Sequence, residues 1–143
     1  MLTGQYEHTL DSKRRLALPT KIREKLGPKV VLTRGIERCL FVYAVPEWVE
    51  FAKRWSALPL SQGGGRSFAR LMLSGAVEQE LDNLGRVLIP EYLKAYAELK
   101  KEIVVVGVFN RLEIWDKARW EKYRAEAEEH FEEIAEGLKE FNV

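Results

Sequence analysis

The sequence is poor in the residues that build disulfide frameworks and metal sites. Among its 143 residues are one cysteine, Cys39, and two histidines, His8 and His130. A single thiol cannot form an internal disulfide, and so few cysteines and histidines do not supply a multi-ligand zinc site. We therefore expect no metal and no other cofactor. We interpret Cys39, which falls in an apolar segment, as a buried small hydrophobic residue and not as a nucleophile.

Long apolar runs are also missing. No run approaches the roughly 20 residues that a membrane helix needs. The first residues show no basic stretch followed by an apolar one, the pattern of a signal peptide. Hydrophobic residues make up 46% of the sequence and charged residues 31%, which is typical of a folded globular protein. We expect a cytoplasmic protein with no membrane partner.

The net charge of +1 conceals an uneven distribution. Residues 1–75 contain 13 Lys and Arg against 6 Asp and Glu, a net charge of +7. Residues 76–143 contain 10 against 16, a net charge of −6. This split predicts a basic surface that meets a polyanion and an acidic region that faces elsewhere. Attraction between opposite ends of neighbouring copies in an oligomer would explain it equally well.

The chain contains an internal repeat. Apolar, glycine, proline and charged positions recur 71 residues later: Gly4 as Gly75, Glu7 as Glu78, Leu10-Asp11 as Leu81-Asp82, Arg15-Leu16 as Arg86-Val87 and Leu18-Pro19 as Ile89-Pro90. After one inserted residue the match resumes at an offset of 72, from Gly35 with Gly107 to Trp48 with Trp120. Agreement across several residue classes indicates a tandem duplication.

Each copy carries the same predicted elements. These are a strand (5–10 or 76–81), a tight turn, a second strand (14–18 or 86–89), a short helix after a proline (20–26 or 91–98) and a hairpin of two strands (30–34 and 39–43, or 103–107 and 111–115). Strands this short cannot close a core alone. We predict a mainly β protein with helices, of the α+β class, in which the halves interlock into one β-barrel about a pseudo-two-fold axis.

The remaining segments predict helices. Residues 5–48 and 76–120 form the two units, 49–75 a helical linker and 121–143 a C-terminal helix. Within the linker, Gly63-Gly64-Gly65 predicts a flexible loop. After Asp116, a suitable N-cap, a long helix carries one apolar stripe: Trp120, Tyr123, Ala127, Phe131, Ile134, Leu138 and Phe141. The stripe either packs on the core or forms a seam with a neighbouring subunit. Glutamates on the opposite face would repel DNA.

Two Asp-x-x-x-Arg segments are the most informative feature. In the second, Asp82 suits the first position of a type I turn and Gly85 the fourth. One interpretation pairs each aspartate with its arginine as a brace. We interpret Asp11 and Asp82, with Gly85, as residues that structure the turns. We interpret the two arginines, Arg15 and Arg86, as DNA contacts, because a guanidinium offers two parallel donors to a guanine edge or a phosphate.

The first turn is the more basic of the two. Lys13, Arg14 and Arg15 are consecutive, and three like charges on an exposed loop repel each other unless a polyanion compensates them. We therefore add Lys13 and Arg14 to the predicted DNA contacts. Lys21, Arg23 and Lys25 follow on the adjacent predicted helix and extend the basic patch toward phosphates.

These segments together resemble the MraZ family of bacterial regulators. The resemblance covers essentially the whole chain and rests on 10–19, Pro46-Glu47-Trp48, Ser74-Gly75-Ala76, 81–90 and 113–116. It implies two AbrB-like swapped-hairpin units, assembly into a ring, and nucleoid-associated transcription control of the division and cell-wall gene cluster, including the regulator's own promoter. It also implies recognition of short G-rich elements repeated in tandem. Arg14 departs from the glycine usual in the family, as at Gly85.

Features of the sequence also suggest two other classes of function. One Asp in each half suggests an aspartic-protease dyad, but an arginine four residues on would hold both carboxylates ionised. We expect neither an enzyme nor a small-molecule substrate. The second class is an AbrB-type antitoxin that binds a protein partner through the acidic C-terminal helix. A C-terminus that folds only with a partner would favour this alternative, and a helix packed on the body would oppose it.

Overall fold

The computed structural model describes all 143 residues and confirms the α+β class. The first half contains β1 (Leu2–Thr9), β2 (Arg15–Ala17), α1 (Thr20–Leu26), β3 (Lys29–Arg34), β4 (Leu40–Ala44), α2 (Val45–Ser56) and α3 (Gly63–Ser74). The second contains β5 (Val77–Glu80), β6 (Arg86–Leu88), α4 (Glu91–Tyr96), β7 (Glu102–Phe109), β8 (Leu112–Asp116), α5 (Lys117–Glu129), α6 (Phe131–Glu136) and the 3₁₀ helix η1 (Lys139–Phe141). The predicted strands and short helices are present, with ends shifted by a few residues.

The two halves interleave as the repeat predicts. The larger sheet has the antiparallel order β1-β7-β8-β4-β3-β5, so each outer strand pairs with a strand of the other half. Replacing every strand by its counterpart in the other copy reverses this order and leaves the sheet unchanged. The pseudo-two-fold axis therefore passes between β4 and β8, the central pair.

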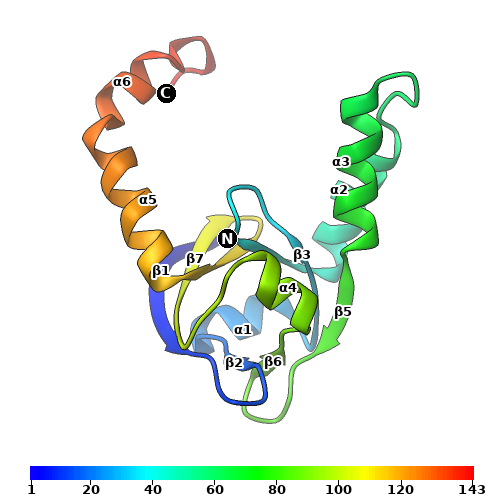
Figure 1. The fold of residues 1–143 in the computed structure, drawn as a ribbon, viewed down its shortest axis with the longest axis vertical. Helices are drawn as coiled ribbons and strands as arrows, with labels where there is room; N and C mark the ends of the chain where they lie inside the picture. The colour runs from blue at the N-terminus through cyan, green and yellow to red at the C-terminus, as the bar shows by residue number, and fades with distance from the viewer.

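A separate two-stranded ribbon, β2 with β6, closes the lower end of the body (Figure 1). The eight strands thus form two sheets, and the prediction of one closed barrel is wrong in this respect. Each ribbon strand has only three residues. A proline follows soon after each of them, at Pro19 and Pro90, and proline has no N–H to extend a ladder.

The strand register corrects the alignment of the two copies. Lys29 lies opposite Glu80, and Glu102 lies opposite Thr9. Thr9 and Glu80 are equivalent positions of the two copies, at an offset of 71. Their partners across the sheet, Glu102 and Lys29, must therefore be equivalent too, and these two residues are 73 apart. The second copy therefore has two extra residues between α4 and β7, not one. Its hairpin loop between β7 and β8 is one residue shorter.

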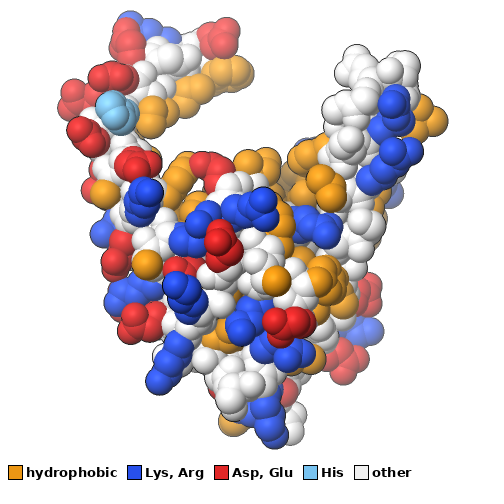
Figure 2. Space-filling view, in the orientation of Figure 1, with side chains coloured by type: hydrophobic (Ala, Val, Ile, Leu, Met, Phe, Trp, Pro, Cys, Tyr) orange, Lys and Arg blue, Asp and Glu red, His pale blue; other side chains and the backbone are white.

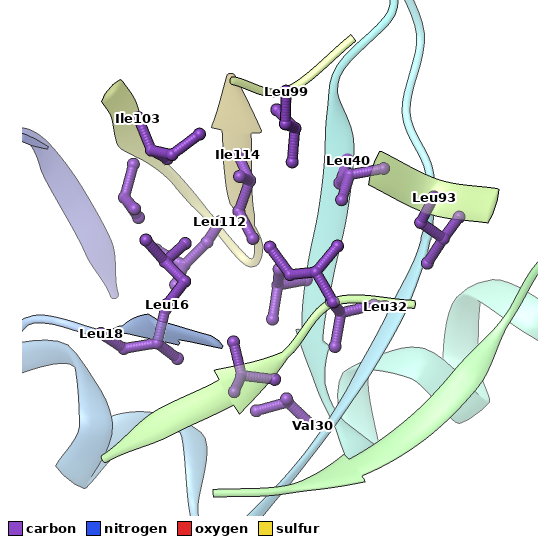
Figure 3. Close-up of a cluster of buried hydrophobic side chains, with 14 of the residues drawn as sticks. Leu16, Leu18, Val30, Leu32, Leu40, Leu93, Leu99, Ile103, Leu112 and Ile114 are labelled. Atoms are coloured by element: carbon purple, nitrogen blue, oxygen red, sulfur yellow. The ribbon is translucent and has the colours of Figure 1, made fainter. Parts of the chain in front are cut away.

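The core is shared by the two copies. It consists of 19 buried apolar residues, most of them from β2, α1, β3 and β4, from their counterparts in the second half and from the segments that join these elements. Leu16 and Val87 lie opposite each other in the ribbon and are fully buried. In Figure 3 the side chains of Leu16 and Leu18 converge with Leu32, Leu112 and Ile114. Neither half could exclude water from these side chains alone, which explains why the repeat must interlock.

Two helical arms extend from the end of the body opposite the ribbon (Figure 1). One is the hairpin of α2 and α3, whose base packs Trp48, Phe51 and Trp55 around Tyr43. The predicted loop at Gly63-Gly64-Gly65 is wrong, because these residues form the first turn of α3. Gly65 passes close to the preceding turn, where an added Cβ would lie 3.5 Å from the Pro59 oxygen. Local propensity is a weak guide where such packing decides.

The C-terminal arm contains α5, α6 and η1. Asp116 caps α5 as predicted and accepts a hydrogen bond from the Arg119 amide. The single long helix is wrong, since the chain leaves helical geometry at His130, whose amide donates to the Ala127 oxygen three residues back. The rings of Trp120 and Tyr123 pack against Trp115 at tilted angles. The later stripe is not core: Phe131, Ile134, Leu138 and Phe141 are exposed.

Candidate nucleic-acid interface

The two Asp-x-x-x-Arg turns have the same geometry. In the first, Asp11 Oδ1 accepts the amides of Lys13 and Arg15, at 2.9 and 2.8 Å, while Oδ2 accepts the Arg15 Nε at 2.8 Å. In the second, Asp82 accepts the Leu84 and Arg86 amides and the Arg86 Nε, the last at 2.7 Å. Each aspartate therefore closes its own turn and braces its own arginine. The turn-structuring interpretation agrees with this geometry.

The same hydrogen bonds stabilise the charged form of both carboxylates. The Arg15 amide, followed by its side chain and the Lys13 amide, lowers the pKa of Asp11 below its ordinary value. The Arg86 amide does the same for the pKa of Asp82. A protease dyad needs two carboxylates that share one proton, so one pKa must rise. Here both fall, and each carboxylate is occupied by its own turn.

The ribbon presents both arginines on one outer face. Arg15 lies opposite Leu88, and Arg86 lies opposite Ala17, while the residues between them point into the core. Diagonal neighbours of this kind are separated by about 7–8 Å. The Arg15 and Arg86 side chains are 33% and 29% exposed. Only their Nε atoms are engaged, so the terminal nitrogens of both guanidinium groups keep their donors for a ligand.

Arg14 and Gly85 occupy the same left-handed position in their turns. Their φ angles are 60° and 74°, so the first turn has the same backbone geometry as the second turn without its glycine. The Arg14 Nε donates to the Ile89 oxygen at 3.0 Å, and the Ile89 amide donates back to the Arg14 oxygen at 2.8 Å. These bonds offset a strain of about 1–2 kcal/mol. They also tie down part of the side chain that we predicted as a DNA contact.

The basic helix α1 lies beside the second turn and not beside the first. Arg23 packs so closely on Gly85 that a Cβ there would overlap its guanidinium. Its Nη2 donates to the Thr20 hydroxyl, whereas its Nε is buried without a partner. Lys25 donates to the Met1 oxygen at 3.0 Å, and Lys21 is exposed. Nearness in sequence predicts that these residues lie beside the first turn. This is wrong for Arg23, because the two halves interleave and bring α1 to the second turn.

Three lysines that the sequence reasoning missed lie beside the first turn. Lys94, Lys100 and Lys101 line a groove of about 620 Å³ together with Asp11 and Ser12. The extra residues before β7 were a signal for them, since the insertion falls in the segment that carries two of the lysines. Lys13 stands exposed on the neighbouring turn.

Charge is distributed along the axis of the molecule. Figure 2 shows Lys and Arg side chains over the body and its lower end, whereas Asp and Glu crowd the outer side of the C-terminal arm. That arm carries Glu126, Glu128, Glu129, Glu132, Glu133, Glu136 and Glu140. The acidic helix therefore lies at the far end from the turns, as expected of a segment that would repel DNA.

Other chemistries have little support in the structure. Cys39 is fully buried, as predicted, and burial raises the pKa of its thiol. No group of three or more His, Cys, Asp or Glu side chains could hold a metal ion. None of the helices combines the length and the apolar character needed to cross a bilayer.

Comparison with known proteins identifies the family. The family model described as the MraZ protein, antitoxin-like, matches twice, over residues 1–71 and 72–142. The chain belongs to the MraZ family. A protein of Caldanaerobacter subterraneus is 49% identical over 143 residues, and proteins of Lactobacillus delbrueckii and Moorella thermoacetica are 48% and 46% identical. Each alignment covers 100% of both chains.

Membership of the MraZ family confirms the resemblance predicted from the sequence. The double match of one family model agrees with the tandem duplication. All three relatives bear the name "Transcriptional regulator MraZ". None is named as an enzyme, in agreement with the expectation that this chain has no catalytic activity.

Proposed function

We propose that this chain is a sequence-specific DNA-binding transcriptional regulator that reads DNA with the ribbon β2–β6 and its two turns. One observation carries the proposal. The outer face of the ribbon presents Arg15 and Arg86 side by side, each braced through Nε by its own aspartate and each with free terminal nitrogens. A braced guanidinium loses little entropy on binding, and its two terminal donors match the N7 and O6 atoms of guanine.

The shape of the ribbon supports the same function. The major groove of B-DNA, about 12 Å wide, admits a two-stranded β-ribbon. A separation of about 7–8 Å between the arginines corresponds to roughly two base-pair steps of 3.4 Å. Two guanines close together in a short G-rich element would suit this spacing. Lys13 and Arg14 on the first turn, with Lys21, Arg23 and Lys25 on α1, would supply phosphate contacts that add affinity without sequence information.

A ring of copies would present many such ribbons to repeated DNA elements. The C-terminal arm is acidic and exposes Phe131, Ile134 and Phe141, while the α2–α3 arm carries Arg54, Arg66 and Arg70 and exposes Leu60 and Leu71. Apolar and charge complementarity favour a contact between the C-terminal arm of one copy and the α2–α3 arm of the next. Such a heterologous contact generates a ring where the rotation closes, and the linked ribbons gain affinity through effective concentration.

Family membership extends the proposal to the targets. The regulated genes would be the division and cell-wall cluster, with the regulator's own promoter among its sites. The protein would then act in the cytoplasm, associated with the nucleoid. Its partner would be double-stranded DNA carrying short G-rich repeats in tandem.

Fluorescence anisotropy with the full chain tests the proposal. Two labelled duplexes are compared across a salt series, one from the promoter upstream of the protein's own gene and one with that sequence scrambled. A sequence-reading regulator binds the promoter tighter by about 10³-fold or more, and both affinities fall as salt rises. Equal binding of the two duplexes, or no binding, would contradict the proposal.

The alternative function is capture of a protein partner by the C-terminal arm, as in an antitoxin. It is favoured by the exposed apolar side chains of α6 and by the antitoxin-like description of the family model. Against it, α5 packs on the body through Trp120 and Tyr123, so this arm is folded without a partner. Monomeric behaviour of the purified chain, with no preference for promoter DNA, would favour the alternative.

A further inference from the structure

The groove beside the first turn brings together lysines that form no ion pair. It is formed where the chain between α4 and β7 passes the end of β1 (Figure 1). Lys94, Lys100 and Lys101 contribute three ammonium groups, and none of them forms an ion pair within the chain. The carboxylate that lines the groove, that of Asp11, is already bonded to its own turn and to Arg15.

The backbone of this groove is fixed, although its lysine side chains reach into solvent. The Leu10 amide donates to the Lys101 oxygen at 2.8 Å. The Lys100 amide donates to the carboxylate of Asp116 at 3.2 Å, and Asp116 is itself only 5% exposed. The lysines therefore start from anchored positions at a set distance from the first turn. A fixed backbone avoids the entropy cost of ordering the loop when the groove binds a ligand.

The second copy of the repeat provides an internal comparison. The hydrogen bond from Leu10 to Lys101 has its counterpart between the Leu81 amide and the Pro28 oxygen. Proline thus stands where the groove has Lys101, and the shorter connection before β3 has no equivalent of Lys100. The two extra residues of the second half therefore create the lysine groove beside the first turn, and the second turn has no equivalent groove.

Two of the cations near the second turn are engaged within the chain. Arg23, the counterpart of Lys94, packs on Gly85. Lys29 lies next to the Glu80 carboxylate, with Nζ 3.9 Å from Oε1. The corresponding pair beside the groove is Thr9 and Glu102, so the positive charge of the groove comes from the three lysines and not from this pair. The two turns therefore match in the arginines that we propose read bases, but they differ in the charged residues that flank them.

We propose that the groove lined by Lys94, Lys100 and Lys101 binds the phosphate backbone of DNA that flanks the bases read by the first turn. This inference rests on the proposed function and deepens it. The ribbon would read the bases, and the groove would hold phosphates of one strand beside the first turn, in addition to any phosphate contacts that α1 makes beside the second turn. The asymmetry orients each ribbon on its DNA element, so that the first turn always lies toward the same side.

The proposal is tested with Lys101→Ala, the double variant Lys100→Ala/Lys101→Ala and the control Lys29→Ala. The control removes the same charge from the strand edge beside the second turn, where Lys29 already faces Glu80. Affinity of the full-length variants for the promoter duplex is measured across a salt series. We expect the slope of log K against log salt to fall by about 0.9 for each groove lysine removed per bound chain, with Lys29→Ala unchanged. Preference for promoter over scrambled DNA should stay at the wild-type ratio, because phosphate contacts carry no sequence information.

Two results would contradict the proposal that the groove binds phosphates. One is a double variant with the wild-type slope and affinity, and the other is a loss in Lys29→Ala equal to that in Lys101→Ala. Failure of the proposed function has a different signature, because the wild-type chain itself would then bind promoter and scrambled duplexes equally. All of the substituted lysines are exposed, and unchanged thermal unfolding of each variant establishes that a changed slope reports on binding.

Discussion

At the scale of single residues, the two turns show how one backbone conformation is reached by two different side chains. Gly85 adopts a positive φ at no steric cost, whereas Arg14 adopts it with the help of its hydrogen bond to Ile89. Local turn chemistry was sufficient to suggest that each aspartate braces its arginine, and the hydrogen bonds agree with that interpretation. It could not predict that Arg23 packs on Gly85, because that contact depends on how the copies interlock.

Two separate features favour glycine at position 85, the positive φ and the close contact with Arg23, and their contributions to stability can be measured separately. Gly85→Ala should lower the free energy of unfolding by about 1–2 kcal/mol for the left-handed backbone, plus a further cost for overlap with Arg23. In the background of Arg23→Ala the overlap is gone, so the cost of Gly85→Ala should shrink to the backbone part alone. Urea unfolding of the four proteins in this cycle gives the coupling. Purely additive effects would show that Arg23 does not press on the turn.

At the scale of elements, periodicity and proline positions were sufficient for the strands and short helices. The predicted 20–26 helix is α1 without any shift, and both hairpins are present. Composition was misleading where tertiary contacts decide. Three glycines predicted a loop but begin α3, and an unbroken helical pattern after Asp116 conceals the break at His130. The ribbon strands were found, but their separation from the main sheet depends on pairing across the copies.

The helical assignment of the glycine segment predicts a gain in stability. Gly64 is exposed in the first part of α3, and an added Cβ there meets nothing within 4 Å. Gly64→Ala should therefore raise the free energy of unfolding by about 0.5–1 kcal/mol, because alanine loses less backbone entropy than glycine in a helix. Thermal or urea unfolding measures this. No gain, or a loss, would indicate that the segment is a loop after all.

At the scale of the whole molecule, the two ends differ: the turns lie at one end and the helical arms at the other. Charge composition predicted a basic region and an acidic one, and their separation along the molecule agrees with it. Composition could not tell whether the apolar stripe after Asp116 meets the body or a neighbour. Trp120 and Tyr123 pack against the body. Phe131, Ile134, Leu138 and Phe141 remain exposed and could contact a neighbouring copy.

The proposed ring predicts that a charge introduced into the apolar stripe of the C-terminal arm weakens the assembly. Phe131→Glu should lower the molecular mass in solution, since it places a charge in the apolar seam between arms. Leu84→Glu is the matched control: both side chains are 65% exposed, but Leu84 lies on the second turn, away from the arms. Light scattering of both variants measures the mass. An unchanged mass for Phe131→Glu would mean that α6 does not contribute to the assembly.

The central claim is that the paired arginines of the ribbon read bases. The most direct measurement is the ratio of promoter to scrambled affinity for Arg15→Lys/Arg86→Lys, which keeps the charge and removes the planar fork of each guanidinium. We expect affinity for scrambled DNA to change little. The promoter preference should fall at least tenfold, since a bidentate pair contributes about 1–3 kcal/mol of discrimination. Unchanged thermal unfolding is the control for intact turns. A double variant that retains the wild-type preference would contradict the account.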